Sequence, residues 1–119
     1  MKVIKSNNIT VFDVDSTLLL YERIRTKEQG KIAFSYGDEV IYLRPHNFHP
    51  TFLKHCHNRG DFVIVWSKNG ASWAEQAVKK LKLSRYVDIV MSKPSRYVDD
   101  KTDMPSVCGD HIFIPEVEE

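Results

Sequence analysis

The stretch ITVFDVDSTL, residues 9–18, decides the fold of this chain. Its first part, residues 9–14, is a run of β-branched and aromatic side chains with no helical period. Such a run predicts a buried strand that ends at a carboxylate. Asp13 and Asp15 therefore stand at the carboxyl end of the first predicted strand, where a polar turn begins.

The same pattern of an apolar run and a polar turn recurs along the chain. A second apolar run, residues 62–66, is followed by a polar turn at 67–70 and by an amphipathic helix over 71–83. An earlier helix of about three turns begins near Pro50 and ends before Gly60. Further strands are predicted at residues 87–91, 95–98 and 111–114. Strands that alternate with helices predict an α/β fold with a mostly parallel sheet covered on both faces.

Residues 18–45, between the first strand and the first helix, predict a small flap. Two strand-like runs, 31–36 and 39–43, flank a turn at Gly37, so we expect a β-hairpin. The basic side chains of the flap are Arg23, Arg25, Lys27 and Lys31. They form either a solvated face or a guide for an anionic substrate.

Length and composition limit the class of protein. The 119 residues predict a single domain, 1–119, because the chain is long enough for one core and too short for a second. Seventeen Lys and Arg against sixteen Asp and Glu give a net charge of +1, which predicts attraction to neither nucleic acid nor a membrane. Cys56 and Cys108 form no CxxC pair and are expected to be reduced. No signal peptide or long apolar span is recognised, so we expect a cytoplasmic protein.

Polar residues follow the predicted strands, and the carboxyl ends of parallel strands meet at one edge of a sheet. The acidic members of this set are Asp13, Asp15, Asp99 and Asp100. At an effective dielectric of about 20, two such charges about 4 Å apart repel by about 4 kcal/mol. A hard divalent cation would offset this repulsion, and Mg²⁺ suits a site with few carboxylate ligands. We expect an ionised Asp13 to attack phosphorus while Ser67 and Lys93 bind the phosphoryl oxygens.

These residues resemble the motifs of the haloacid dehalogenase (HAD) superfamily, in the family's order. Residues 11–18, VFDVDSTL, are similar to its first motif, DxDx[TV]. Ser67 resembles the Ser or Thr of the second motif, Lys93 the lysine of the third, and Asp99-Asp100 the acidic pair of the fourth. The resemblance covers roughly residues 9–103, and four motifs in order are more specific than any one of them. It implies a Rossmann-like three-layer sandwich and phosphoryl transfer through an aspartyl-phosphate.

The resemblance also implies a role for each residue. Asp13 would be the nucleophile and a metal ligand. Asp15 would be the general acid and base, and its backbone carbonyl would bind the metal. Asp100 is the favoured metal ligand of the acidic pair, with Asp99 in support. Phosphatase activity is expected rather than dehalogenation, because dehalogenases of the superfamily lack the second acid of the first motif.

Two features depart from larger members of the superfamily. Only residues 94–98 separate Lys93 from Asp99, too few for a helix, so Lys93 must lie in a loop. The alternative sources of positive charge are Lys79, Lys80 and Lys82 on the preceding helix. The flap leaves no room for a cap domain, so the resemblance implies a capless enzyme whose open site admits a large phosphorylated substrate, such as a protein, a nucleic-acid end or a polysaccharide. A neighbouring subunit could supply a lid, which leaves an oligomer open.

Other interpretations stand beside this one. A catalytically silent module of the same fold could bind a phosphorylated partner, and a polynucleotide-end phosphatase would use Arg23 and Arg25, although the net charge argues against it. In the turn 67–70, Ser67, Lys68 and Asn69 could bind phosphate or simply cap the next helix. The histidines around Cys56 are His46, His49, His55 and His57. Their spacing fits no closed zinc site, so packed or surface side chains are favoured over a metal site.

Overall fold

The computed structural model describes residues 1–21 and 30–116 of the chain. Three of the four basic flap residues, Arg23, Arg25 and Lys27, lie outside the described residues. In chain order the elements are β1 (Ile9–Asp13), β2 (Leu19–Leu20), β3 (Ile32–Tyr36), β4 (Glu39–Pro45), α1 (His49–Asn58), β5 (Phe62–Ser67), α2 (Ala71–Lys80), the 3-10 turn η1 (Ser84–Tyr86), β6 (Ile89–Ser92) and α3 (Met104–Cys108). The predicted α/β class is confirmed.

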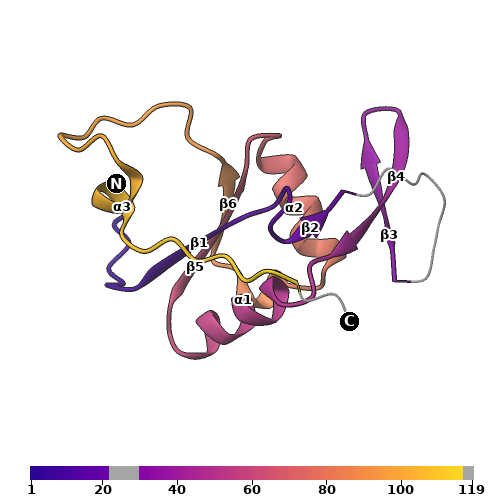
Figure 1. Ribbon diagram of the computed structural model, residues 1–119, viewed down its shortest axis with the longest axis horizontal. Helices are drawn as coiled ribbons and strands as arrows, with labels where there is room; N and C mark the ends of the chain where they lie inside the picture. The colour runs from indigo at the N-terminus through magenta and orange to yellow at the C-terminus, as the bar shows by residue number, and fades with distance from the viewer. Residues whose placement is uncertain (22–29, 117–119) are drawn as a thin grey trace.

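Three strands form a parallel sheet in the order β1-β5-β6 (Figure 1). Asp13 pairs with Trp66 and Ser67 pairs with Ser92, so the strands end at one common edge. The last of these strands begins at Ile89, two residues later than predicted. We attribute the later start to Asp88. Its N–H donates to the carbonyl of Val63, and its side-chain carboxylate accepts the N–H of Val63.

Both predicted long helices are confirmed. Pro50 lies in the first turn of α1, where a missing N–H costs no helical hydrogen bond. The second helix, α2, ends three residues earlier than predicted because the chain turns at Lys82, whose φ is 59°. The N–H of Leu83 then bonds to the carbonyl of Val78 at 2.9 Å, which closes the helix end. No helix among the described residues is long and apolar enough to cross a membrane.

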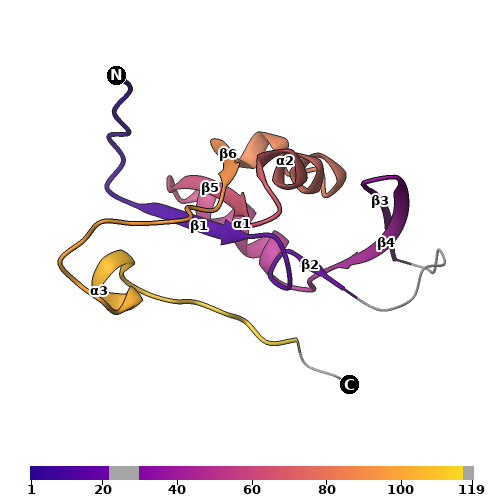
Figure 2. The same cartoon turned by 90° about the horizontal axis from the view of Figure 1, so that it is seen from above.

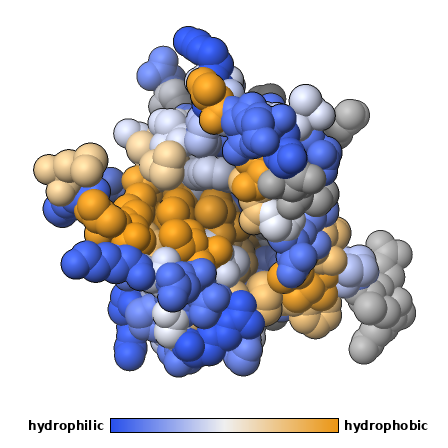
Figure 3. All heavy atoms as spheres, turned by 90° about the vertical axis from the view of Figure 1, so that its left-hand side faces the viewer, coloured by the Kyte–Doolittle hydropathy of each residue, from blue (hydrophilic) through white to orange (hydrophobic). Residues whose placement is uncertain are grey.

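The two helices share one hydrophobic core with one face of the parallel sheet. Phe12, Val63 and Val65 point into this core and are buried. The opposite face was expected to be covered as well, and the described residues do not cover it: Ile9 and Val11 are 47% and 36% exposed. The side of the molecule that carries α3 and the start of β1 shows a hollowed hydrophobic area ringed by hydrophilic side chains (Figure 3). A parallel sheet with one open face replaces the expected one with two covered faces.

The predicted flap hairpin is confirmed, and it docks on α2. The strands β2, β4 and β3 form an antiparallel sheet, with a turn at Gly37, whose φ is 60° (Figure 1). The side chain of Gln76 bonds twice to the backbone of Ser35 in β3, at 2.7 and 3.0 Å. The Phe34 and Trp73 rings pack with centroids 5.6 Å apart. These contacts fix the described part of the flap against the helix that follows β5.

Two predicted strands are wrong. Residues 95–98 and 111–114 form no strand, and the chain instead runs irregularly through the short helix α3. Pro94 carries no N–H, and Val98 is fully exposed, so the first segment neither pairs with the sheet nor packs on it. The last segment runs on the opposite side of β1 from α2 (Figure 2). Glu116, just beyond this segment, forms an ion pair with Arg44 at 2.9 Å, in the strand that precedes α1.

Candidate active site

The ends of three parallel strands bring together three of the predicted site residues. Asp13 ends β1, Ser67 ends β5 and Lys93 directly follows β6. The N–H of Lys93 donates to the carbonyl of Ser67 at 2.9 Å, so the sheet bonding continues one residue into the loop. This bond directs the Lys93 side chain toward β1, and its Nζ lies 3.9 Å from Oδ1 of Asp13. Of the alternative lysines, Lys79 pairs with Glu75 at 2.7 Å.

Within the described part of the chain, Asp13 has only long contacts to side chains. Thr17 Oγ1 lies 3.5 Å from Oδ2 of Asp13, and the side chain of Asp13 is 29% exposed. Burial raises the pKa of Asp13, the Lys93 ammonium opposes that rise, and the charge of Asp15 adds to it. A carboxylate that is partly desolvated and weakly hydrogen-bonded is suited to act as a nucleophile toward an electrophile that reaches it.

A tight loop after β1 sets the direction of Asp15. The carbonyl of Val14 accepts the N–H groups of Thr17, Leu18 and Leu19 at 3.0 to 3.2 Å. Ser16 has a φ of 63°, in the left-handed region that favours glycine, and its N–H bonds to the carbonyl of Leu19 at 2.8 Å. The loop therefore turns the chain back sharply and points the side chain of Asp15 toward α2.

The carboxylate of Asp15 accepts four hydrogen bonds. Its Oδ2 accepts from Ser67 Oγ and from Asn69 Nδ2, both at 3.0 Å. Its Oδ1 accepts from Trp73 Nε1 at 2.9 Å and from the hydroxyl of Tyr21. Both oxygens are thus engaged, in contrast to those of Asp13 only two residues earlier.

The turn after β5 supplies the hydroxyl and amide donors. Ser67 is fully buried, and its Oγ accepts the N–H of Asn69 at 3.0 Å. The side chain of Lys68 is exposed. Ser92 Oγ, at the end of β6, accepts the N–H of Ala71 at 3.0 Å. Ser92 therefore caps α2, and Ser67 does not act as the cap that was considered from sequence.

Tyr21 and Trp73 contact the site and were not predicted to do so. From its spacing Trp73 was assigned to the helix face and the core, and it is indeed 6% exposed. The sequence gives no sign that its indole N–H meets a carboxylate from another strand end. A tyrosine three residues after Leu18 likewise carries no spacing signal, because the turn at Ser16 that brings it to Asp15 depends on one backbone conformation.

The acidic pair lies apart from this arrangement. Asp99 Oδ1 accepts the N–H of Lys101 at 2.9 Å, and Asp100 Oδ2 lies 3.6 Å from Lys101 Nζ. Both side chains are exposed. Within residues 1–21 and 30–116, no three His, Cys, Asp or Glu side chains form a group that could hold a metal ion.

The donor set at β1 fits Mg²⁺ in part. The carboxylate of Asp13 is a hard oxygen donor with no strong competing bond, and the carbonyl of Asp15 is of the same chemical kind. The carboxylate of Asp15 is occupied by its four donors. The third protein ligand would have to come from the 99–100 loop, which does not form a cluster with these oxygens.

Of the histidines near Cys56, two are packed in the interior, His57 is partly buried and His55 lies at the surface. His46 and His49 are buried, and their rings stack with centroids 3.8 Å apart. His49 Nδ1 bonds to the carbonyl of Thr17 at 2.8 Å, and its Nε2 accepts the N–H of Ile114 at 2.9 Å. His49 thus ties the loop after β1 to the C-terminal segment.

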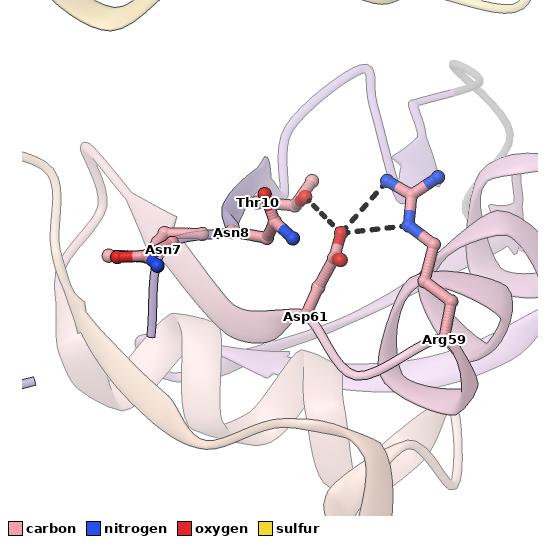
Figure 4. Close-up of a pocket in the computed structure, with 6 residues that line it drawn as sticks. Asn7, Asn8, Thr10, Arg59 and Asp61 are labelled. Atoms are coloured by element: carbon pink, nitrogen blue, oxygen red, sulfur yellow. Dashed lines mark hydrogen bonds and ion pairs between the residues drawn. The ribbon is translucent and has the colours of Figure 1, made fainter. Parts of the chain in front are cut away.

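A separate polar pocket of about 340 Å³ lies at the other end of the sheet, where β1 and β5 begin (Figure 4). Asp61 Oδ2 accepts there from Thr10 at 2.8 Å and from Arg59 at 2.8 and 3.1 Å. The arginine lowers the pKa of Asp61. The acid and base neutralise each other, which leaves a structural ion pair rather than a reactive group.

The strand ends therefore offer a weakly bonded carboxylate, an ammonium group 3.9 Å from it, a buried hydroxyl and a second, firmly held carboxylate. Comparisons with protein-family models, with curated proteins and with solved structures find no match for this chain. Its chemistry has to be argued from this geometry.

Proposed function

We propose that the chain is a phosphatase of the capless HAD type, which hydrolyses a phosphomonoester through an aspartyl-phosphate on Asp13. The observation that carries the proposal is the approach of Lys93 Nζ to Asp13 Oδ1 at 3.9 Å, with Ser67 at the end of β5, the strand between β1 and β6. These three groups come from the ends of three different strands. Converging side chains of this kind at the carboxyl edge of a parallel sheet are typical of a ligand site.

In the proposed reaction, a carboxylate oxygen of Asp13 forms a bond to phosphorus as the bond to the leaving oxygen breaks. Asp15 gives a proton to that oxygen. Lys93 and Ser67 bind the equatorial oxygens, with Asn69 and Lys68 as further donors from the same turn. In the second half, Asp15 takes a proton from water, the water oxygen bonds to phosphorus, and Asp13 is released with inorganic phosphate.

The metal we propose is Mg²⁺. Asp13 and the carbonyl of Asp15 would hold it, and Asp100, supported by Asp99, would complete the protein ligands if residues 99–100 move toward β1. Bound there, the ion would offset the negative charge of the phosphoryl group. Burial raises the pKa of Asp13, and a cation held at this point would favour the ionised form of its carboxyl.

We further infer that the parallel sheet is the core of a Rossmann-like three-layer sandwich whose second helical layer is not formed by the described residues. The strand order β1-β5-β6 supports this inference. The described residues place no cap domain over the site, so we infer a phosphorylated substrate that can be large. We also propose a cytoplasmic setting, as expected from the sequence. A lid from a second subunit stays compatible with this proposal.

The test is Mg²⁺-dependent release of phosphate from para-nitrophenyl phosphate. Asp13→Asn should abolish it, and Lys93→Gln should lower kcat/KM on the order of 100-fold, because each removes a group that acts on the transferred phosphoryl. Asp38→Asn, which changes an exposed aspartate in the flap turn, and Lys79→Gln are the matched controls. No release by the unchanged protein across a broad panel of phosphate esters would contradict the proposal.

A second candidate function is a silent module that binds a phosphorylated partner at the same site. It is favoured by two observations: the described residues form no group that could hold a metal, and Asp15 already has four donors. Calorimetry with beryllium fluoride, a mimic of the aspartyl-phosphate, separates the two functions. Binding of beryllium fluoride that requires Mg²⁺ supports the enzyme. If the protein binds neither Mg²⁺ nor beryllium fluoride, the result supports the module.

A further inference from the structure

The hydrogen bonds to Asp15 come from two different sources. Ser67 and Asn69, which bond to Oδ2, belong to the turn proposed to bind phosphate. Tyr21 and Trp73, which bond to Oδ1, lie outside that turn. We propose that Tyr21 and Trp73 are positioning residues that hold Oδ1 of Asp15 in place and link it to the flap. This inference rests on the proposed function, in which Asp15 transfers the proton.

Trp73 is suited to a permanent anchor. Its indole N–H can only donate, so in its buried position it needs an acceptor, and Asp15 is the acceptor that it has. Its ring packs against the rings of Phe34 and Tyr36, at centroid distances of 5.6 and 5.7 Å. Because α2 begins only two residues earlier, at Ala71, Trp73 also sits on a rigid support.

Tyr21 is suited to a second anchor on the same oxygen. It directly follows β2, which pairs with β4 of the flap. Its hydroxyl donates to Oδ1 of Asp15, the same oxygen that accepts from Trp73. With both anchors in contact with the flap sheet, the position of Oδ1 depends on how the flap sits against α2.

The other two donors can be exchanged. An arriving phosphoryl group offers charged oxygens to Ser67 and Asn69, and their hydrogens would turn from Oδ2 to these oxygens. Oδ2 would then be free to hold the transferred proton and to face the leaving oxygen, while Oδ1 stays bonded to Tyr21 and Trp73. The carboxyl of Asp15 would keep its place through the change, as proton transfer requires.

The experiment compares two substrates that need the proton to different degrees. Para-nitrophenyl phosphate has a good leaving group and needs little help from an acid, whereas glycerol phosphate has a poor one. Asp15→Asn should lower kcat/KM for glycerol phosphate much more than for the aryl ester, and Trp73→Phe and Tyr21→Phe should each raise the aryl-to-alkyl ratio about tenfold. Trp66→Phe and Tyr42→Phe, which remove an indole and a hydroxyl with no described bond to Asp15, should keep the wild-type ratio.

A second readout does not depend on activity. The indole N–H resonance of Trp73, assigned by its loss in Trp73→Phe, should shift in Asp15→Asn, while that of Trp66 should stay. Tyr21→Phe keeps the test decisive if Trp73→Phe fails to fold, because Tyr21 is 44% exposed and its replacement leaves the core intact.

The outcomes separate the two levels of the proposal. A rise in the aryl-to-alkyl ratio in both anchor variants supports the positioning role. An active wild type whose anchor variants lose both substrates equally, or lose neither, overturns the positioning role and leaves the phosphatase proposal standing. A wild type that hydrolyses neither ester, at any Mg²⁺ concentration, overturns the proposed function and this inference with it.

Discussion

Asp13 and Asp15 lie two residues apart, yet their surroundings differ in kind. Among the described residues, Asp13 has side-chain contacts at 3.5 and 3.9 Å only, whereas Asp15 accepts four hydrogen bonds. The difference arises from the loop after β1, where the left-handed turn at Ser16 sends the second carboxylate toward α2. Two identical side chains are thereby placed in different surroundings, one weakly bonded and one firmly held.

His46 shows how a buried residue makes stability depend on pH. Its Nδ1 accepts the N–H groups of Phe48 and His49 at 3.1 Å, and so bonds to free N–H groups at the start of α1. Burial lowers the pKa of His46 from its ordinary value of 6.5, the charge of His49 adds to this, and Glu116 opposes it. The folded protein therefore holds fewer protons on His46 than the unfolded chain does just below pH 6.5.

We predict that stability falls on acidification because of this residue. Its contribution is fully present above pH 6.5 and is lost as the pH falls through the lowered pKa, since protonated Nδ1 cannot accept. His46→Asn keeps an acceptor and removes the titration, so its Tm should drop less between pH 7 and pH 5, by about 3 °C. Thermal unfolding at the two pH values measures this, with exposed His111→Asn as control. Equal drops in His46→Asn and in the unchanged protein would contradict it.

At the scale of the elements, a strand was predicted correctly where a continuous apolar run also pairs with a neighbouring strand. The runs 9–14 and 62–66 pair with each other, and the flap runs pair through a turn at Gly37. The runs 95–98 and 111–114 have comparable composition but no strand beside them, so composition alone misassigned them. Pairing is a property of the whole sheet, and a single sequence reports it only indirectly.

One of the side chains that dock the flap on α2 carries no sequence signal. Gln76 accepts the N–H of Ser35 and donates to its carbonyl, much as a neighbouring strand would. Gln76→Ala removes both bonds, so we expect the Ser35 amide to exchange with solvent about tenfold faster. Hydrogen exchange followed by NMR measures this. Glu75→Ala, which loses only an exposed pair with Lys79, is the control, and unchanged exchange at Ser35 would show that the flap is held by other contacts.

At the scale of the whole molecule, the sequence predicted the class of fold and most of the residues that meet at the strand ends. Strand ends are readable because they follow apolar runs, and so Asp13, Ser67 and Lys93 could be found. Trp73 could not be found in this way, because its hydrogen bond to Asp15 depends on how α2 lies relative to the loop after β1. The expected gathering of Asp99 and Asp100 at the same edge depended on a fourth strand that does not form.

The missing fourth strand also leaves the parallel sheet narrower, because a strand pairs with the edge of a sheet. Covering the face where Ile9 and Val11 are exposed would take a second packed layer on that side. The C-terminal segment lies on that side of β1, and it is held through Glu116 and through the bond from Ile114 to His49 (Figure 2). These contacts keep the segment near α1, and in the described structure Ile9 and Val11 stay exposed.

The central claim is that phosphate passes through Asp13, and trapping the intermediate tests it most directly. The protein is mixed with Mg²⁺ and para-nitrophenyl phosphate, quenched during turnover and reduced with borohydride, which converts an aspartyl-phosphate to homoserine. Peptide mass spectrometry then locates the modified residue. We predict homoserine at position 13 alone, and none in the absence of substrate or in Asp13→Asn. Phosphate release without homoserine at position 13, or homoserine at another aspartate, would contradict the account.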